Sequence, residues 1–251
     1  MDRLISLTSN SSEISQDYFP PIELDSKHTY ALGLYTLNTY NSIPNIIEGV
    51  NNKFHFTLSD QNGKTREEVI SLEEGCYEIE AIQGYLREKL VNFTENEITF
   101  VGEEEKPFKI SIKPNSNTLN IEIFCVFTIH FDRQGSIGKV LGFSERKLEK
   151  NILHVSDSVI QISAVSEINV ECNIVEGSFR NGKPCHTIFT FYPDVEPGYK
   201  LSLQPTNVIY LPVNTRTINN ITLRLVDQEG RLVNFRKEEI SIQLNLRRLW
   251  G

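Results

Sequence analysis

The feature that most constrains the fold is a strict two-residue alternation near the carboxyl end of the chain. Ile240, Ile242, Leu244 and Leu246 alternate with polar residues. Since successive side chains of a β-strand point to opposite faces, this pattern predicts a strand with one buried face. Residues 221–226 alternate in the same way, and a turn-like Asp-Gln-Glu-Gly segment follows them. The chain is therefore predicted to consist mainly of β-sheet.

Length and charge limit the classes of protein that fit this chain. Its 251 residues can form one large β-domain or two small ones with a substantial core. The net charge of −8 disfavours direct nucleic-acid binding and anionic membranes, which require a basic surface. No apolar run approaches the ~20 residues of a membrane span, and the first residues lack the apolar core of a secretion signal. We therefore expect a protein that is not secreted by a signal peptide and has no membrane span.

The side chains that usually perform catalysis do not form a convincing pattern. The cysteines are scattered and include no C-x-x-C pair, so we expect buried thiols in a reducing compartment and no metal site. Cys185 and His186 are adjacent, but neighbours in a strand point to opposite faces and are poorly placed for a thiolate–imidazole pair. The sequence predicts no catalytic, metal or cofactor residues and no small-molecule substrate. The protein is therefore not expected to be an enzyme.

The amino-terminal residues suggest a contact surface. Residues 1–16 are rich in serine and asparagine, which fits either a frayed terminus or an arm that becomes ordered on a neighbouring subunit. We interpret residues 1–19 as a flexible arm. The rigid, aromatic run that follows and the basic-aromatic carboxyl terminus are predicted to lie at an interface with a partner. The predicted interface residues are Tyr18, Phe19, Pro20, Pro21 and Trp250.

In the middle of the chain, the spacing of apolar residues changes from the two-residue period of a strand to the period of a helix. Ile79, Ile82, Leu86 and Leu90 recur at three- and four-residue steps, which predicts one face of an amphipathic helix. Short strands are expected at residues 98–101, 108–112 and 119–123. We therefore predict that residues 71–145 form a small α+β domain. It is inserted into a discontinuous β-domain made of residues 20–70 and 146–251, in which regular turns indicate a sandwich or barrel.

Several short blocks resemble a pattern in proteins of Polinton (Maverick) elements, the virus-like DNA transposons of animal genomes. The blocks cover nearly the whole chain, and their order and spacing together carry the resemblance. They are residues 40–45 (Tyr-Asn-Ser-Ile-Pro-Asn), 51–54 (Asn-Asn-Lys-Phe), 75–80, 141–143 (Leu-Gly-Phe), 170–174, 185–189, 208–214, 226–228 and 234–236.

This resemblance implies a minor capsid, or penton, protein with a jelly-roll fold. Relatives of this kind form homopentamers at the fivefold vertices of icosahedral shells, beside the major capsid protein. Major capsid proteins of the lineage carry two jelly rolls and are about twice as long, which favours the penton assignment. We therefore expect an all-β dominated fold, a jelly-roll β-sandwich with an inserted α+β domain, that assembles in a host cell and resides in a virion or capsid. The alternative is a non-enzymatic β-sandwich module that binds carbohydrate or a receptor.

Overall fold

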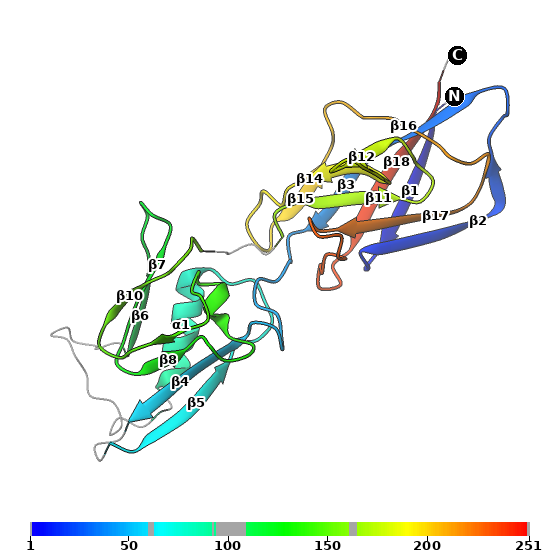
Figure 1. The fold of residues 1–251 in the computed structure, drawn as a ribbon. Helices are drawn as coiled ribbons and strands as arrows, with labels where there is room; N and C mark the ends of the chain where they lie inside the picture. The colour runs from blue at the N-terminus through cyan, green and yellow to red at the C-terminus, as the bar shows by residue number, and fades with distance from the viewer. Residues whose placement is uncertain (1, 60–62, 92, 94–108, 161–164, 250–251) are drawn as a thin grey trace. The chain divides into compact units, whose positions relative to one another are not determined.

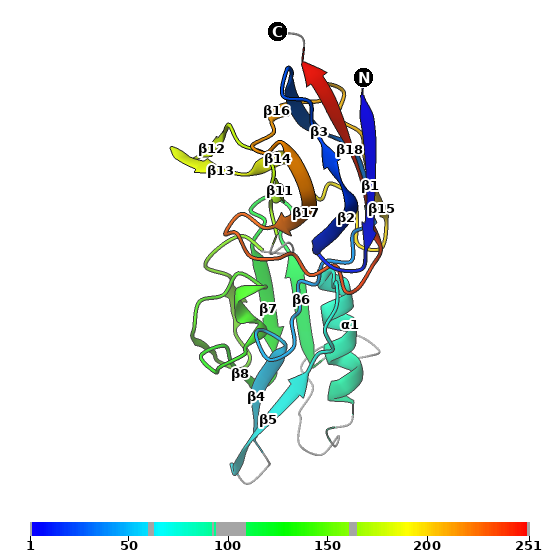
Figure 2. The same cartoon turned by 90° about the vertical axis from the view of Figure 1, so that its right-hand side faces the viewer.

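The chain divides into two compact units, each with its own hydrophobic core. The computed structural model describes residues 2–59, 63–91, 93, 109–160 and 165–249. The sandwich unit comprises Met1–Ile43 and Val165–Gly251, and the inserted unit comprises Pro44–Ala164. Both units are drawn in Figures 1 and 2. The strand predicted at residues 98–101 lies outside the described residues.

The sandwich unit is built from two antiparallel sheets. The first sheet has the strand order β1-β18-β3-β15, with β16 also pairing with β3. Its strands are β1 (Arg3–Ser9), β3 (Thr29–Tyr40), β15 (Lys200–Leu203), β16 (Leu211–Pro212) and β18 (Ile240–Leu249). The pairing of β18 with β3 joins segments from the two ends of the chain, as a jelly roll requires.

The second sheet has the strand order β14-β11-β17-β2. Its strands are β2 (Glu13–Glu23), β11 (Ile168–Cys172), β14 (Thr187–Phe191) and β17 (Thr217–Val226). A hairpin of β12 (Ser178–Arg180) and β13 (Lys183–Cys185) precedes β14. Strands β2 and β14 are therefore the two edges of this sheet.

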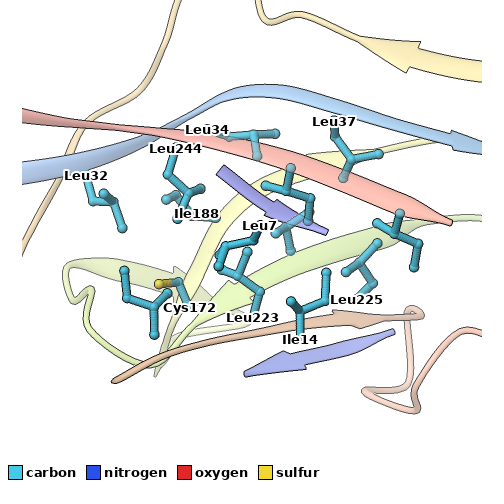
Figure 3. Close-up of a cluster of buried hydrophobic side chains, with 14 of the residues drawn as sticks. Leu7, Ile14, Leu32, Leu34, Leu37, Cys172, Ile188, Leu223, Leu225 and Leu244 are labelled. Atoms are coloured by element: carbon cyan, nitrogen blue, oxygen red, sulfur yellow. The ribbon is translucent and has the colours of Figure 1, made fainter. Parts of the chain in front are cut away.

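The predicted alternation in β18 and β17 produces the core of the sandwich. The even-numbered residues Ile240 to Leu246 of β18 are at most 1% exposed. Leu223 and Leu225 of β17 are fully buried and face them from the other sheet (Figure 3). Burying two such apolar faces against each other removes both from water, which is the dominant favourable contribution to folding. The predicted all-β, jelly-roll class is confirmed.

The amino terminus differs from the flexible arm expected from sequence. Strand β1 pairs with β18 over its full length, and β2 pairs with β17. The reason is a short alternation that the serine and asparagine content obscures: Ile5, Leu7 and Ile14 are buried in the sandwich core. Residues 3–23 are therefore structural strands of the two sheets.

Two neighbouring leucines of β1 provide a test of this correction. Leu7 is 4% exposed, whereas Leu4 is 60% exposed. We expect Leu7→Ala to lower the free energy of unfolding by about 3 kcal/mol, because it leaves a cavity in the core. The matched variant Leu4→Ala is expected to change it by less than about 0.5 kcal/mol. Urea unfolding of both variants measures the difference, and equal effects would show that β1 is not part of the folded core.

The inserted unit combines two small sheets with one amphipathic helix. The sheets have the orders β5-β4-β8-β9 and β10-β7-β6. The helix α1 (Ile79–Leu90) buries the four residues predicted from its period. The remaining elements are β4 (Lys53–Ser59), β5 (Thr65–Ser71), β6 (Ile110–Pro114), β7 (Ile121–Cys125), β8 (Thr128–His130), the 3₁₀ turn η2 (Ile137–Lys139), β9 (Lys147–Leu148) and β10 (Leu153–Val155).

The boundaries of the inserted unit are wider than residues 71–145. Strands β4 and β5 pair in the same sheet as β8 and β9. Phe54 and Phe56 of β4 are fully buried and lie against Phe127, with ring centroids 6.3 and 5.0 Å apart. Because these rings complete the core of the inserted unit, residues 44–70 and 146–164 belong to it and not to the jelly roll.

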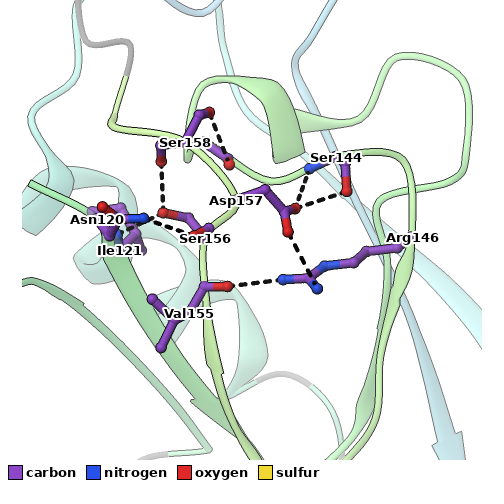
Figure 4. A network of polar contacts seen from close by, with 9 residues as sticks. Asn120, Ile121, Ser144, Arg146, Val155, Ser156, Asp157 and Ser158 are labelled. Atoms are coloured by element: carbon purple, nitrogen blue, oxygen red, sulfur yellow. Dashed lines mark hydrogen bonds and ion pairs between the residues drawn. The ribbon is translucent and has the colours of Figure 1, made fainter.

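A polar network fixes one loop of the inserted unit (Figure 4). The Asp157 carboxylate accepts hydrogen bonds from the backbone N–H of Ser144 at 2.8 Å and from its hydroxyl at 2.7 Å. These bonds, followed by the charge of Arg146, hold the pKa of Asp157 below its usual value. Ser156 Oγ accepts from the N–H of Ile121 and donates to the carbonyl of Ser158. The loop is thereby joined to β7 and to the segment before β9.

Candidate functional site

The predicted interface residues 18–21 lie on β2, at an edge of the second sheet. Phe19 is fully exposed, and Pro20 and Pro21 follow it directly. Tyr18 points the other way and packs against the sandwich core. Burial raises the pKa of Tyr18, and the neighbouring Cys172 adds to this shift. Of these four residues, Phe19 is therefore the apolar side chain that a partner can reach. Trp250 lies outside the described residues.

The outer side of β2 carries acidic residues around this aromatic ring. Glu13, Asp17 and Glu23 are all exposed. Asp17 Oδ1 accepts a hydrogen bond from the Asn220 side chain at 2.8 Å, and Glu23 Oε2 accepts from the Thr217 hydroxyl at 3.0 Å. These bonds orient the carboxylates without neutralising them. The edge formed by β2 is therefore a negatively charged surface with one protruding aromatic side chain.

The opposite edge of the same sheet carries an open groove of about 610 Å³. It lies between the β12–β13 hairpin, β14 and residues 209–211. Phe179 of β12 is 71% exposed and Ile209 is 66% exposed, so the groove has two exposed apolar side chains among polar lining residues. Phe189 of β14 is half-buried and stacks on Phe191. A concave surface with exposed apolar side chains is a site at which a side chain of another molecule can be buried.

Polar groups in the groove are held by neighbouring residues. The Arg180 guanidinium lies 3.1 Å from the Glu167 carboxylate and donates to the carbonyl of Gln228 at 2.7 Å. Burial and the charge of Glu171 would raise the pKa of Cys185, but its hydrogen bonds with Ser178 and Thr187 outweigh them and bring the pKa below its usual value. The groove thus contains a fixed cation at one wall and a partly exposed thiol at another.

Cys185 and His186 have separate hydrogen-bond partners. The Cys185 sulfur lies 3.3 Å from Ser178 Oγ, whereas His186 Nδ1 lies 2.7 Å from the carbonyl oxygen of Val175. The two adjacent side chains therefore bind different partners.

The prediction that the four cysteines are buried thiols is wrong for two of them. Cys76 and Cys185 are partly exposed, whereas Cys125 and Cys172 are buried. None of the four forms a disulfide.

Within residues 2–59, 63–91, 93, 109–160 and 165–249, no three His, Cys, Asp or Glu side chains gather closely enough to hold a metal ion. Over the same ranges, no helix has the length and apolar character needed to cross a bilayer.

Two histidines of the inserted unit give its stability a pH dependence. His130 is 5% exposed, with Nε2 2.6 Å from the Thr57 hydroxyl, and His55 lies on the neighbouring strand β4. Burial lowers the pKa of both histidines; for His130 the carboxylates of Glu67 and Asp132 oppose this shift, and Lys147 and Arg133 add to it. The unfolded chain therefore binds protons more readily than the folded chain.

We expect the inserted unit to lose stability as the pH falls below about 6.5, the ordinary histidine pKa, toward the lowered values of the folded state. Urea unfolding of the full chain at pH 7.5 and 5.5 measures this loss, with hydrogen exchange reporting on each unit. His130→Asn is expected to reduce the pH dependence, because one of the two titrating groups is removed. An unchanged pH dependence in this variant would contradict the assignment.

The predicted interface residues include an exposed residue at one edge of the second sheet, and none at the other edge. Phe19 was identified because it stands beside two prolines. Phe179 and Ile209 were overlooked, because each is a single apolar residue next to turn residues and shows no periodicity. The sequence signal that could have identified Phe179 is the turn Arg180-Asn181-Gly182 that follows it. This turn predicts a tight hairpin, and a hairpin this short cannot bury the Phe179 side chain.

Comparison with known proteins shows a likeness to a solved structure. No family model matches the chain, and no curated protein matches it. Among solved structures, it is similar to the crystal structure of the selenomethionine-labelled mavirus penton protein, with a TM-score of 0.50 and 11% sequence identity. The likeness covers 99% of this chain and 100% of that chain, so it includes both units. The expected resemblance to a penton protein is confirmed for the fold: over almost its whole length, this chain folds like the mavirus penton protein.

Proposed function

We propose that this protein is a minor capsid (penton) protein, which self-assembles as a homopentamer at the vertices of an icosahedral shell. The observation that supports it is the likeness to the mavirus penton protein along both complete chains. A jelly roll alone serves many functions. A likeness that includes the inserted unit as well as the sandwich unit is more specific than a likeness in the jelly roll alone. In this proposal the neighbouring partner is the major capsid protein, and assembly takes place within the host cell.

The surface of the sandwich unit is suited to ring formation. A cyclic oligomer with more than two members needs two different, complementary surfaces on each subunit. The second sheet carries two such surfaces, the protruding Phe19 on β2 and the groove beside β14, at its two edges. An exposed aromatic ring and a groove with exposed apolar side chains are typical of surfaces that are covered by a partner.

The mass of the purified protein tests the proposal. We expect light scattering after size exclusion to report five times the 28.8 kDa chain mass at high protein concentration. Negative-stain electron micrographs should show rings with fivefold symmetry. A protein that remains monomeric at every concentration, with no rings in micrographs, would contradict self-assembly.

The second candidate function, a binding module for carbohydrate or a receptor, is favoured by a different property of the groove. Phe179 offers an exposed aromatic face beside the polar side chains of Asn169, Arg180 and Asn181, and sugars commonly stack on such faces while hydrogen bonding to neighbouring groups. Specific binding on a glycan array, lost in Phe179→Ala, would support this function. An array without specific binding would leave assembly as the role of the groove.

A further inference from the structure

We propose that Phe19 of one copy inserts into the groove beside β14 of the next copy, so that the sandwich units join edge to edge and head to tail. The occupant of the groove is thus a second copy of this chain. The inference rests on the proposed self-assembly and names the contact through which it takes place.

The exposed ring of Phe19 has the properties of an anchor. It is 100% exposed and lies where the pairing of β2 with β17 shifts register, and Pro20 and Pro21, which follow it, have their φ angles fixed by the proline ring. A side chain on such a restricted backbone loses little additional freedom when it binds. Since aromatic side chains dominate interface energetics, removing this ring from water is a large favourable contribution.

The groove offers this ring apolar and aromatic side chains to pack against, beside polar lining residues. Phe179 and Ile209 expose most of their side chains at its walls, and Phe189 and Leu211 are half-buried within it. Its volume of about 610 Å³ accommodates one phenyl ring together with the adjacent proline. Phe19 can therefore lie against Phe179, which becomes covered in the same step.

The two surfaces are placed for a head-to-tail contact. Across the second sheet, Thr187 of β14 pairs with Glu171, and Glu171 pairs with Arg224. Arg224 in turn pairs with Glu13 of β2, so these residues form one row from edge to edge. From this row the groove extends toward the end of the sheet where Asn169 pairs with Thr190 and where Arg180 donates to the carbonyl of Gln228, past the end of β17. Phe19 lies on the other side of the row, beyond Asp17, which pairs with Asn220. The two surfaces are therefore at opposite edges and toward opposite ends of the sheet. Figure 2 shows the hairpin and β2 on opposite sides of the sandwich.

This placement determines the symmetry that the contact can produce. Phe19 and the groove are on opposite edges of the sheet, so each copy uses its β2 edge toward one neighbour and its β14 edge toward the other. A heterologous contact of this kind closes into a ring when the rotation between copies divides a full turn. The inferred contact therefore agrees with the proposed pentamer and would not produce a twofold dimer.

Charge complementarity supports the same pairing. The β2 edge carries the exposed carboxylates of Glu13, Asp17 and Glu23. The β12–β13 hairpin carries the exposed Lys183 and also Arg180, whose charge is paired with the Glu167 carboxylate in the groove. Lys183 is therefore the positive charge that this hairpin offers to a partner. Opposite charges facing each other across an interface steer association and fix its register. Two β2 edges would repel each other, which disfavours the alternative of an edge paired with its own copy.

Alanine substitutions measure the contribution of the two aromatic rings. We expect Phe19→Ala and Phe179→Ala each to weaken self-association at least tenfold, as measured by light scattering over a concentration series. The double variant should be little weaker than either single variant, because both rings belong to one contact. Tyr199→Ala is the matched control: Tyr199 is 62% exposed and does not line the groove, so association should be unchanged.

A cross-link identifies the partner surface directly, because Cys185 already lines the groove. With diamide as the oxidant, Phe19→Cys is expected to form a disulfide between copies. The product should be a ladder of covalent multimers on non-reducing gels. The ladder should disappear when Cys185→Ser is added, which also excludes cross-linking through Cys76.

The outcomes separate this inference from the proposed function. Pentameric rings that persist in both alanine variants, with no cross-link to Cys185, would overturn the inferred contact and leave the capsid role intact. A wild-type chain that is monomeric at all concentrations would overturn both. A sugar that binds the groove while Phe19→Ala still assembles normally would also overturn the inference. Concentration-dependent loss of rings in the alanine variants, together with the cross-link, would establish it.

Discussion

Replacing Phe56 with alanine is expected to unfold the inserted unit while the sandwich unit remains folded. Phe56 is fully buried, and its ring lies 5.0 Å from that of Phe127 and 5.8 Å from that of Phe54. Removing a buried phenyl ring costs about 4 kcal/mol, through lost transfer energy and the cavity that remains. Since the free energy of unfolding of a whole domain is only about 5–15 kcal/mol, this loss is a large fraction of the total.

Hydrogen exchange with peptide resolution measures the effect in each unit separately. Protection should fall throughout residues 44–164 and stay unchanged in β3, β17 and β18, because the two cores share no residues. Val69→Ala is the matched control in the adjacent strand β5, since Val69 is 47% exposed. Simultaneous loss of protection in both units would show that they unfold as one.

Replacing Gly142 with alanine is expected to destabilise the inserted unit by about 4 kcal/mol. Gly142 has a φ angle of +77°, a conformation that costs an L-residue roughly 1–2 kcal/mol. A Cβ added there would lie 2.3 Å from the carbonyl oxygen of Ser158, so the loop would have to move. That movement would break the hydrogen bonds that the Gly142 carbonyl accepts from the N–H groups of Asp157 and Ser158, each 3.0 Å long.

Gly49 provides a matched control within the same unit. Its φ angle is +73°, but a Cβ added there would meet nothing within 4 Å. Gly49→Ala therefore measures the cost of the positive φ angle without a steric clash. We expect it to lower the free energy of unfolding by only about 1 kcal/mol. Urea unfolding of the two variants gives the difference, which we attribute to the contact with Ser158. Equal losses would show that the loop can relax around the added methyl group.

The contrast between the two units matters for the proposed capsid role. The edge that carries Phe19 and the edge that carries the groove both belong to the sandwich unit, whereas the buried histidines belong to the inserted unit. Acidification is therefore expected to affect the inserted unit first and to leave the inferred contact between sandwich units unchanged. Light scattering at pH 7.5 and 5.5 would detect any change in assembly.

Local sequence determined the elements that have a clear period. Alternation placed Ile240 to Leu246 on the buried side of a strand, and three- and four-residue spacing placed Ile79, Ile82, Leu86 and Leu90 on the buried side of a helix. These predictions succeeded because the period of a single element depends only on its own geometry and on one apolar neighbour.

Tertiary structure alone decided which elements share a core and which surfaces remain uncovered. The alternation of Phe54 and Phe56 predicts a strand equally well in either unit; its pairing with β8 and the contact with Phe127 assign it to the inserted unit. In the same way, Leu7 becomes structural only because β18 lies beside it, and Phe179 is exposed only because its hairpin reaches past the sheet. Pairing and exposure depend on residues far away in the chain, so a local pattern does not contain them.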